Sequence, residues 1–85
     1  MPAKVRVLLF ASAREAVGAS QLEWPVPSGG SELAELLLAL VRKHPRLAPI
    51  LKVSRFVRNG EYLAARHGSI HPGDEVAIHP PYGGG

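Results

Sequence analysis

The sequence predicts an α+β domain in which one amphipathic helix covers one face of a mixed β-sheet of four to five strands. Three observations support this prediction. Only one long segment, residues 31–44, has apolar side chains at helical spacing. Short alternating segments bounded by turn residues precede and follow it. The 85 residues suffice for one domain, which we place at residues 1–79, followed by an extended, flexible tail at residues 80–85.

The first two segments predict a β-hairpin. Apolar side chains alternate with other residues over residues 4–10, and Leu8 and Phe10 make the second face of this strand partly apolar as well. Alternation returns over residues 21–26. Pro25 favours an edge position for this second strand, because proline has no N–H to donate to a neighbouring strand.

The segment 31–44 predicts the one long helix. Ser31 is expected to cap its start by accepting a hydrogen bond from an early backbone N–H. Pro45 ends it, because the residue before a proline avoids helical geometry. One face of this helix carries an apolar stripe: Leu33, Leu36, Leu37, Leu40 and Val41.

Two connections surround these elements. Residues 11–19 form a loop with helical leanings that ends at Gly18. A proline-containing connection that covers one end of the core holds Leu47, Ile50 and Leu51. These patterns leave the order of the strands in space undetermined.

The C-terminal half predicts three more strands. Residues 56–63 read as a hairpin, because Asn59 and Gly60 suit a type I′ turn. A Pro-Gly-Asp turn at residues 72–74 then leads into a last strand over residues 75–79.

Composition excludes several classes of protein. The chain has 46% hydrophobic and 20% charged residues, as in a folded globular domain. It contains no cysteine, which excludes disulfide scaffolds, thiolate metal sites and cysteine nucleophiles. No apolar run approaches the ~20 residues that cross a bilayer, and the N-terminus has no signal-peptide segment, so we expect a cytoplasmic protein.

Charge is concentrated in residues 42–66, which we call the basic band. It holds seven cations against the single acid Glu61, a local charge of +6 in a chain of net charge +3. Such a band is either a solvated face or a surface that steers an acidic partner. Nucleic-acid binding is less favoured, because Phe56 and Tyr62 offer few rings for base stacking.

Few side chains suggest catalysis or metal binding. None of the serines lies in a nucleophile-elbow context. His67 and His71 are four residues apart, but Gly68 argues against the helix that would bring them to one metal ion, so we expect no metal site. Residues 28–31 precede the long helix and could hold an anion, although a plain turn is the simpler interpretation.

The C-terminus is the unusual feature. Pro80 and Pro81 favour a stiff, extended start to the tail, whose six residues reach about 20 Å. The following residues are Tyr82, Gly83, Gly84 and Gly85. Glycines lack a Cβ and can pass through a narrow channel, so the terminal carboxylate could be placed inside another protein. The alternative is a tail without a function.

These residues resemble the ubiquitin-like sulfur-carrier family of the β-grasp fold, and within it the small subunits of molybdopterin synthase. The ending from Pro72 to Gly85 is similar to the family's Gly-Asp-Glu-Val-Ala and Pro-Pro-x-x-Gly-Gly pattern. The resemblance runs nearly end to end. It also includes Phe10–Ala11, Arg14–Glu15, Gly18, His44–Pro45 and Asn59–Gly60–Glu61.

The resemblance implies a mechanism and a set of partners. An adenylating enzyme of the ubiquitin-activating type would use ATP to activate Gly85, and a cysteine desulfurase or rhodanese would supply sulfur for a thiocarboxylate. Residues 80–84 would then insert into a large subunit that holds the catalytic pocket, in a heterotetramer of two small and two large subunits. There the sulfur would pass to cyclic pyranopterin monophosphate, in molybdenum cofactor biosynthesis. The chain itself would keep no permanent cofactor.

The resemblance also maps a partner interface to Phe10, Tyr62 and His79. His79 replaces the usual large apolar residue, Arg58 a small apolar one, and Gly83 a common Ser or Thr. Two alternatives stay open. A related carrier could feed thiamine, cysteine or tRNA thiolation, or modify lysines. A non-catalytic β-grasp interaction or RNA-binding module would instead use the basic band.

Overall fold

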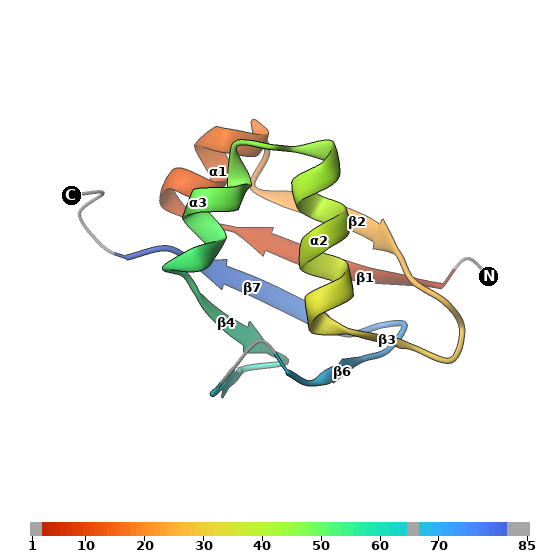
Figure 1. Cartoon of the computed structure of the whole chain (residues 1–85). Coiled ribbons are helices and arrows are strands. Elements are labelled where there is room, and N and C mark those ends of the chain that lie inside the picture. Colours follow the sequence, from red (N-terminus) through yellow and green to blue (C-terminus); the bar gives the residue numbers. More distant parts are fainter. Residues whose placement is uncertain (1–2, 65–66, 82–85) are drawn as a thin grey trace.

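The computed structural model describes residues 3–64 and 67–81 (Figure 1). Tyr82, Gly83, Gly84 and Gly85 lie outside the described residues, so the predicted properties of the tail end are not addressed by the structure. The helices are α1 (Ala11–Val17), α2 (Leu33–Lys43) and α3 (Leu47–Lys52). The strands are β1 (Lys4–Leu9), β2 (Gln21–Pro25), β3 (Ser31–Glu32), β4 (Arg55–Arg58), β5 (Glu61–Leu63), β6 (Ser69–Ile70) and β7 (Glu75–His79).

The main sheet is mixed and has the strand order β2-β1-β7-β4-β5. The central strand β7 and its neighbour β1 come from opposite ends of the chain and run parallel, while every other pairing in this sheet is antiparallel. The edge position predicted for β2 is confirmed. Pro25 sits at its end, opposite Lys4 of β1.

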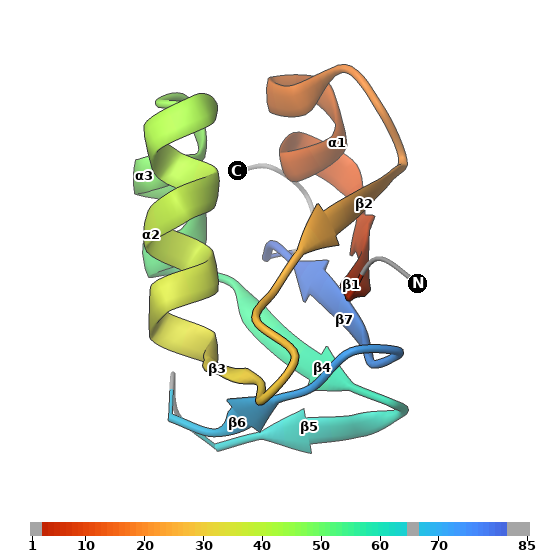
Figure 2. The ribbon, with the colours of Figure 1, turned by 90° about the vertical axis from the view of Figure 1, so that its right-hand side faces the viewer.

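The helices α1, α2 and α3 all lie on one face of this sheet, and the other face carries no element among the described residues (Figure 2). The apolar stripe of α2 packs onto the sheet; Leu33, Leu36, Leu37 and Leu40 are buried there, and Val41 is half-buried. The same core takes Val5, Val7, Leu9, Phe56, Val76 and Ile78 from the strands. The prediction of an α+β domain with one main helix on a mixed sheet is confirmed.

Two connections are more ordered than the sequence predicted. Residues 11–17 form the short helix α1, which ends at Gly18. Gly18 has a φ of +85°, and its N–H donates to the Arg14 carbonyl at 2.8 Å. Residues 47–52 form a helix in spite of Pro49. Proline is tolerated there because it lies in the first turn, where the backbone N–H has no helical acceptor.

The predicted cap at Ser31 is wrong. Ser31 belongs to β3, which pairs with β6, and α2 begins only after Glu32. The Ser31 hydroxyl lies 3.1 Å from the Glu35 carboxylate and accepts no hydrogen bond from the helix backbone. The small β3–β6 sheet was not predicted, because two residues are too few to show a periodic pattern.

The two predicted turns are confirmed. Asn59 and Gly60, with φ values of +49° and +86°, join β4 to β5 as a type I′ turn requires. In the Pro-Gly-Asp turn the Asp74 N–H donates to the His71 carbonyl at 3.0 Å, and Gly73 has a φ of +92°. Among the described residues, no helix is both long and apolar enough to cross a membrane.

Gly30 closes the turn before β3, and its environment explains why this position requires glycine. Its φ is +92°, and its N–H donates to the Pro27 carbonyl at 2.9 Å. A Cβ at this position would lie 2.7 Å from the Ile70 carbonyl oxygen and 2.8 Å from a ring carbon of His71. This segment therefore acts as a packed turn, with the backbone of residue 30 against β6.

We predict that Gly30→Ala lowers the free energy of unfolding by about 2 kcal/mol or more, because it adds both left-handed strain and a clash with β6. Gly29→Ala is the matched control, since a Cβ there meets nothing within 4 Å. Urea denaturation of the two variants measures the difference. Equal stability of the two variants would contradict the packed turn.

Candidate functional site

The face of the main sheet that the helices leave bare, here called the outer face, carries a row of apolar side chains. The strand register aligns Leu8 with Ala77, Ala77 with Val57, and Val57 with Tyr62, across β1, β7, β4 and β5. Tyr62, at the β5 end of the row, has 68% of its surface exposed. Leu8 and Val57 are half-buried and Ala77 is buried between them. An apolar row that no helix covers and that ends in an exposed aromatic ring favours a docking surface.

Phe10 and His79 extend this surface at the ends of β1 and β7. Their rings are stacked, with centroids 4.5 Å apart and planes 9° from parallel. Phe10 is 42% exposed and His79 is half-buried. The parallel pairing brings them together, because Leu9 is in register with Ile78 and each is followed directly by one of the two rings.

The opposite border of the apolar row is charged. Arg6 pairs in register with Glu23 of β2 and with Glu75 of β7. Its guanidinium lies 3.5 Å from the Glu75 carboxylate, in an exposed ion pair. The outer face therefore has an apolar centre with polar groups beside it, which is the anatomy of a protein interface.

All three residues predicted as partner contacts, Phe10, Tyr62 and His79, lie on this outer face. The structure thus places them on one surface, although their role as contacts stays a prediction. Pro80 and Pro81 follow His79 directly, so the described start of the tail leaves from the same surface.

Sequence reasoning missed a groove at the base of the tail. Pro80, Pro81 and His79 line it together with Val53 and Arg55. Arg55 lies directly opposite His79 in the β4–β7 register, and Val53 is 62% exposed. Alternation in β4 could have indicated Arg55, because the burial of Phe56 turns its two neighbours toward the outer face.

A polar clamp holds the strands of this face in register. The Asn59 backbone N–H donates to the Glu75 carbonyl at 2.8 Å, and the Glu75 N–H donates back to the Asn59 side-chain oxygen at 2.8 Å. The Asn59 side-chain amide also donates to the Asp74 carboxylate at 3.0 Å, and the His71 N–H donates to the other carboxylate oxygen at 2.8 Å. The clamp ties the β4–β5 turn to the start of β7.

This clamp favours the charged form of Asp74. Partial burial raises the pKa of its carboxyl, but the hydrogen bonds from Asn59 and from the His71 backbone, with the positive charge of Arg58 and His71 nearby, outweigh burial. The pKa is therefore lower than the usual value of 3.8. A carboxyl with a lowered pKa stabilises the fold above its unfolded-state pKa, and this contribution is lost as the pH falls through the folded-state pKa.

We predict that the stability advantage of the parent chain over Asp74→Asn is largest near neutral pH and shrinks as the pH falls below 3.8. Thermal melts of both proteins from pH 7 to pH 2 measure it. Asp74→Asn keeps the shape of the side chain and removes its titration. A stability difference that stays constant over this range would show that the Asp74 charge contributes nothing.

The basic band does not form one face. Arg58 turns its guanidinium to the Ser69 carbonyl, at 2.5 Å. Lys43 lies over the Trp24 ring, with its Nζ 5.8 Å from the centroid. Arg55 reaches the outer face opposite His79, while the others that the structure describes, Arg42, Arg46 and Lys52, belong to the helix layer. Arg66 lies outside the described residues.

Two further candidates came from the sequence, a metal site and an anion site before the long helix. Within residues 3–64 and 67–81, no three His, Cys, Asp or Glu side chains gather as a metal site requires. The segment before α2 is the packed turn of Gly30.

The fold defines a ubiquitin-like protein of the β-grasp class, and similar solved structures support this. SAMP1 from Haloferax volcanii superposes with a TM-score of 0.80 at 30% identity, covering 96% of this chain and 99% of that one. The small archaeal modifier protein 1 from Methanosarcina acetivorans gives 0.80 at 27% identity, covering 100% and 99%.

The family follows from the sequence comparison. A model of the ThiS family matches residues 7–85, and the chain belongs to this family. Curated relatives share the name molybdopterin synthase sulfur carrier subunit. That of Chlamydomonas reinhardtii is 34% identical, covering 96% of this chain and 99% of the relative. That of Dictyostelium discoideum is 31% identical, covering 100% of both chains. That of Arabidopsis thaliana is 38% identical, covering 96% of this chain and 83% of the relative.

Proposed function

We propose that this protein is the sulfur carrier subunit of molybdopterin synthase and that its terminal Gly85 carries the sulfur. The observation that carries the proposal is the near end-to-end similarity, at 31–38% identity, to relatives of that name. The Gly-Gly-Gly ending and the absence of cysteine support it, because a carrier without a thiol side chain must use its terminal carboxylate.

The proposed chemistry converts the Gly85 carboxylate, a poor electrophile, into a thiocarboxylate that can donate sulfur. An oxygen of the Gly85 carboxylate attacks the α-phosphorus of ATP on an adenylating enzyme, and pyrophosphate leaves. A persulfide sulfur from a desulfurase or rhodanese attacks the acyl adenylate, and AMP leaves. A second thiol then cleaves the sulfur–sulfur bond and releases the thiocarboxylate. ATP is thus a substrate of the activating enzyme and no resident cofactor of this chain.

The carrier then acts as the donating subunit, and the catalytic pocket belongs to the large subunit. The outer face, with Phe10, Tyr62 and His79, docks on the large subunit in the cytoplasm, within a heterotetramer. Residues 80–84 carry the thiocarboxylate into the pocket, where sulfur passes to cyclic pyranopterin monophosphate. The start of the tail next to the stacked rings of Phe10 and His79 supports this arrangement, because docking and insertion then use one continuous surface.

The decisive experiment is an intact-mass measurement of the protein isolated from its own cells. A carrier gains the mass difference between one sulfur and one oxygen, and peptide mapping assigns the gain to the C-terminal peptide. Incubation with the adenylating enzyme, ATP and a persulfide donor should produce the same gain. Its absence under both conditions would refute the proposal.

We predict that removal of Gly85 reduces sulfur delivery about 100-fold or more. The new terminus is still a glycine carboxylate, but the reactive carbon retreats by about 3.5 Å, and a misplacement of even about 1 Å can cost that factor. Gly84→Val should block insertion by its bulk. Thermal melts of both variants should match the parent. Sulfur delivery at the parent rate without Gly85 would rule out the terminal-carrier mechanism.

A second prediction concerns docking. Tyr62→Lys should weaken binding to the large subunit by about tenfold or more, because it puts a charge at the exposed end of the apolar row. Glu61→Lys is the matched control, since this neighbouring residue of β5 alternates to the other side of the strand. Calorimetry of both variants against the large subunit measures the effect. Unchanged affinity for Tyr62→Lys would remove this residue from the interface.

A second candidate function is protein modification, in which the Gly85 carbonyl forms an amide with a lysine amine of another protein. The similarity to the small archaeal modifier protein 1 supports it. The two functions share the acyl adenylate and differ in the nucleophile. Mass spectrometry of lysine peptides carrying the C-terminal glycines would reveal the modifier, and a thiocarboxylate without such peptides would favour the carrier.

A further inference from the structure

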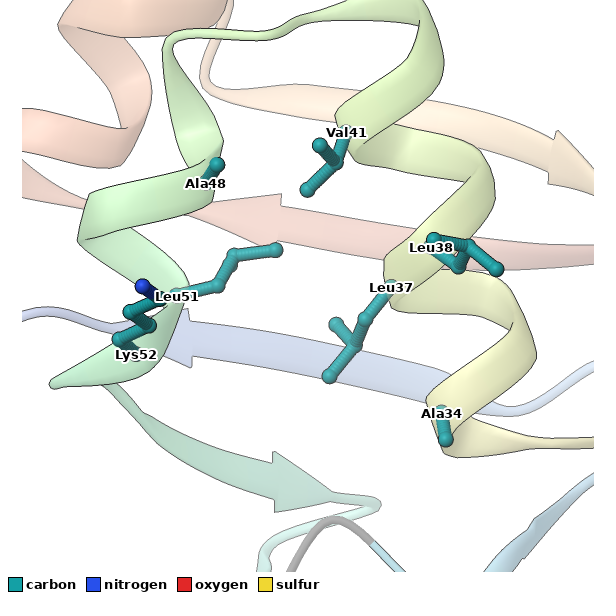
Figure 3. A pocket seen from close by; sticks show the side chains of 7 residues that line it. All are labelled: Ala34, Leu37, Leu38, Val41, Ala48, Leu51 and Lys52. Carbon is teal, nitrogen blue, oxygen red and sulfur yellow. The ribbon is translucent and has the colours of Figure 1, made fainter.

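The helix layer contains an apolar groove that the proposed function does not use. It lies between α2 and α3, on the side of the molecule away from the outer face (Figures 1 and 3). Leu37 and Leu51 are buried and form its floor, and Leu38 at its edge is 53% exposed. Its other lining residues are Ala34, Val41, Ala48 and Lys52.

The shape of this groove suits the side chains of a helix. Figure 3 shows Leu37 and Val41 of α2 and Leu51 of α3 pointing into the space between the two helices. The groove measures about 210 Å³, which is less than the roughly 300–1,000 Å³ of a typical small-molecule pocket. Its walls are helices, whose backbone groups bond internally and offer no edge to an extended strand. An amphipathic helix can instead insert an apolar stripe.

The charge around the groove decides what kind of helix fits. Residues 36–60 contain no Asp or Glu. Lys52 lines the groove itself, Arg42 follows Leu38 by one helical turn, and Arg46 precedes α3. The nearest acid on α2, Glu35, is bound by Ser31 and lines a different hollow, beside Trp24. The groove is therefore apolar inside and has only positive charge at its Lys52 end.

We propose that the α2–α3 groove is a docking site for an acidic amphipathic helix of a partner protein. Apolar side chains of that helix pack on Leu37, Leu38 and Val41, and its carboxylates face Lys52 and Arg42. A second copy of this chain is the wrong occupant, because pairing two such grooves would bring like charges together. A nucleic acid is also disfavoured, because the lining is aliphatic and has no ring for stacking.

This site is separate from the docking surface of the sulfur-carrier function. The stacked rings of Phe10 and His79, Tyr62 and the start of the tail all belong to the outer face, whereas the groove belongs to the helix layer. A partner held in the groove leaves the outer face and the tail accessible. The chain can therefore be tethered by one protein while its C-terminus is processed by another.

The test uses two designed helical peptides with leucines at positions i, i+3, i+4 and i+7. One carries glutamate at its remaining positions and the other lysine. Each is titrated into the isotope-labelled full chain, and amide shifts are followed by NMR at low and high salt. We expect the glutamate peptide to shift the amides of Leu38, Val41, Ala48 and Lys52, with a Kd that rises with salt. The lysine peptide should leave them unchanged.

Variants make the test specific. Leu38→Gln should raise the Kd of the glutamate peptide about tenfold or more. Tyr62→Gln, which also replaces an exposed apolar side chain by glutamine but on the outer face, should leave this Kd unaltered. Lys52→Glu should weaken the glutamate peptide and strengthen the lysine peptide. All three positions are exposed, so melting temperatures near that of the parent confirm that the variants fold.

Several results would overturn the proposal. Equal binding of both peptides, amide shifts confined to the outer face, or no shifts at all would rule out an acidic helix in the groove. Concentration-dependent dimerisation that is lost in Leu38→Gln would make a second copy the occupant. Binding of the groove to anionic vesicles or RNA in preference to the glutamate peptide would make a membrane or a nucleic acid the occupant. None of these results bears on the thiocarboxylate, whose detection depends on the C-terminus alone. The proposal and the sulfur-carrier function can therefore fail independently.

Discussion

The parallel pairing of β1 with β7 is the interaction on which the rest of the structure depends. These strands come from the two ends of the chain and lie at the centre of the sheet, where Val7 meets Val76 and Leu9 meets Ile78 in buried register. Parallel neighbours cannot be joined by a tight turn, so the intervening chain has to cross the sheet. Here α2 makes that crossing and contributes much of the core.

One consequence is the unequal use of the two sheet faces. All the helical cover lies on one side, so β1 buries alternate residues, whereas the central β7 buries Val76, Ala77 and Ile78 in succession. The outer face keeps an apolar row beside a charged border. Such a face suits docking, because docking needs exposed apolar area in a fixed arrangement.

A second consequence concerns the tail. Because β7 is central, the chain leaves the sheet from its middle, beside Phe10 and opposite Arg55. The last strand is held on both sides by hydrogen-bonded neighbours and at its start by the Asn59–Asp74 clamp. The described base of the tail is therefore fixed by the central strand of the sheet.

The basic residues, unlike the apolar ones, do not gather in one place. The acid-free stretch 36–60 runs through α2, α3 and β4 and so reaches both sides of the molecule. Arg58 serves the fold by donating to the Ser69 carbonyl, and Arg55 joins the outer face. Lys43 lies over the Trp24 ring, and Lys52 lines the apolar groove of the helix layer. One basic sequence feature therefore divides into structural and surface roles, and its net charge alone does not reveal which residue has which role.

The sequence by itself determined the features that depend on a few neighbouring residues. The apolar stripe of α2, the edge strand ending in Pro25, and the turns at Asn59–Gly60 and Pro72–Gly73 are matters of side-chain spacing and local φ preference. Through resemblance it also predicted Phe10, Tyr62 and His79 as partner contacts, a role that stays a prediction. Only the tertiary structure decided the order of the strands, the β3–β6 pair that takes Ser31 away from its expected cap, and the stacking of Phe10 on His79. These features join residues far apart in the chain, so no local pattern could encode them, and the stacking in particular follows from the β1–β7 register.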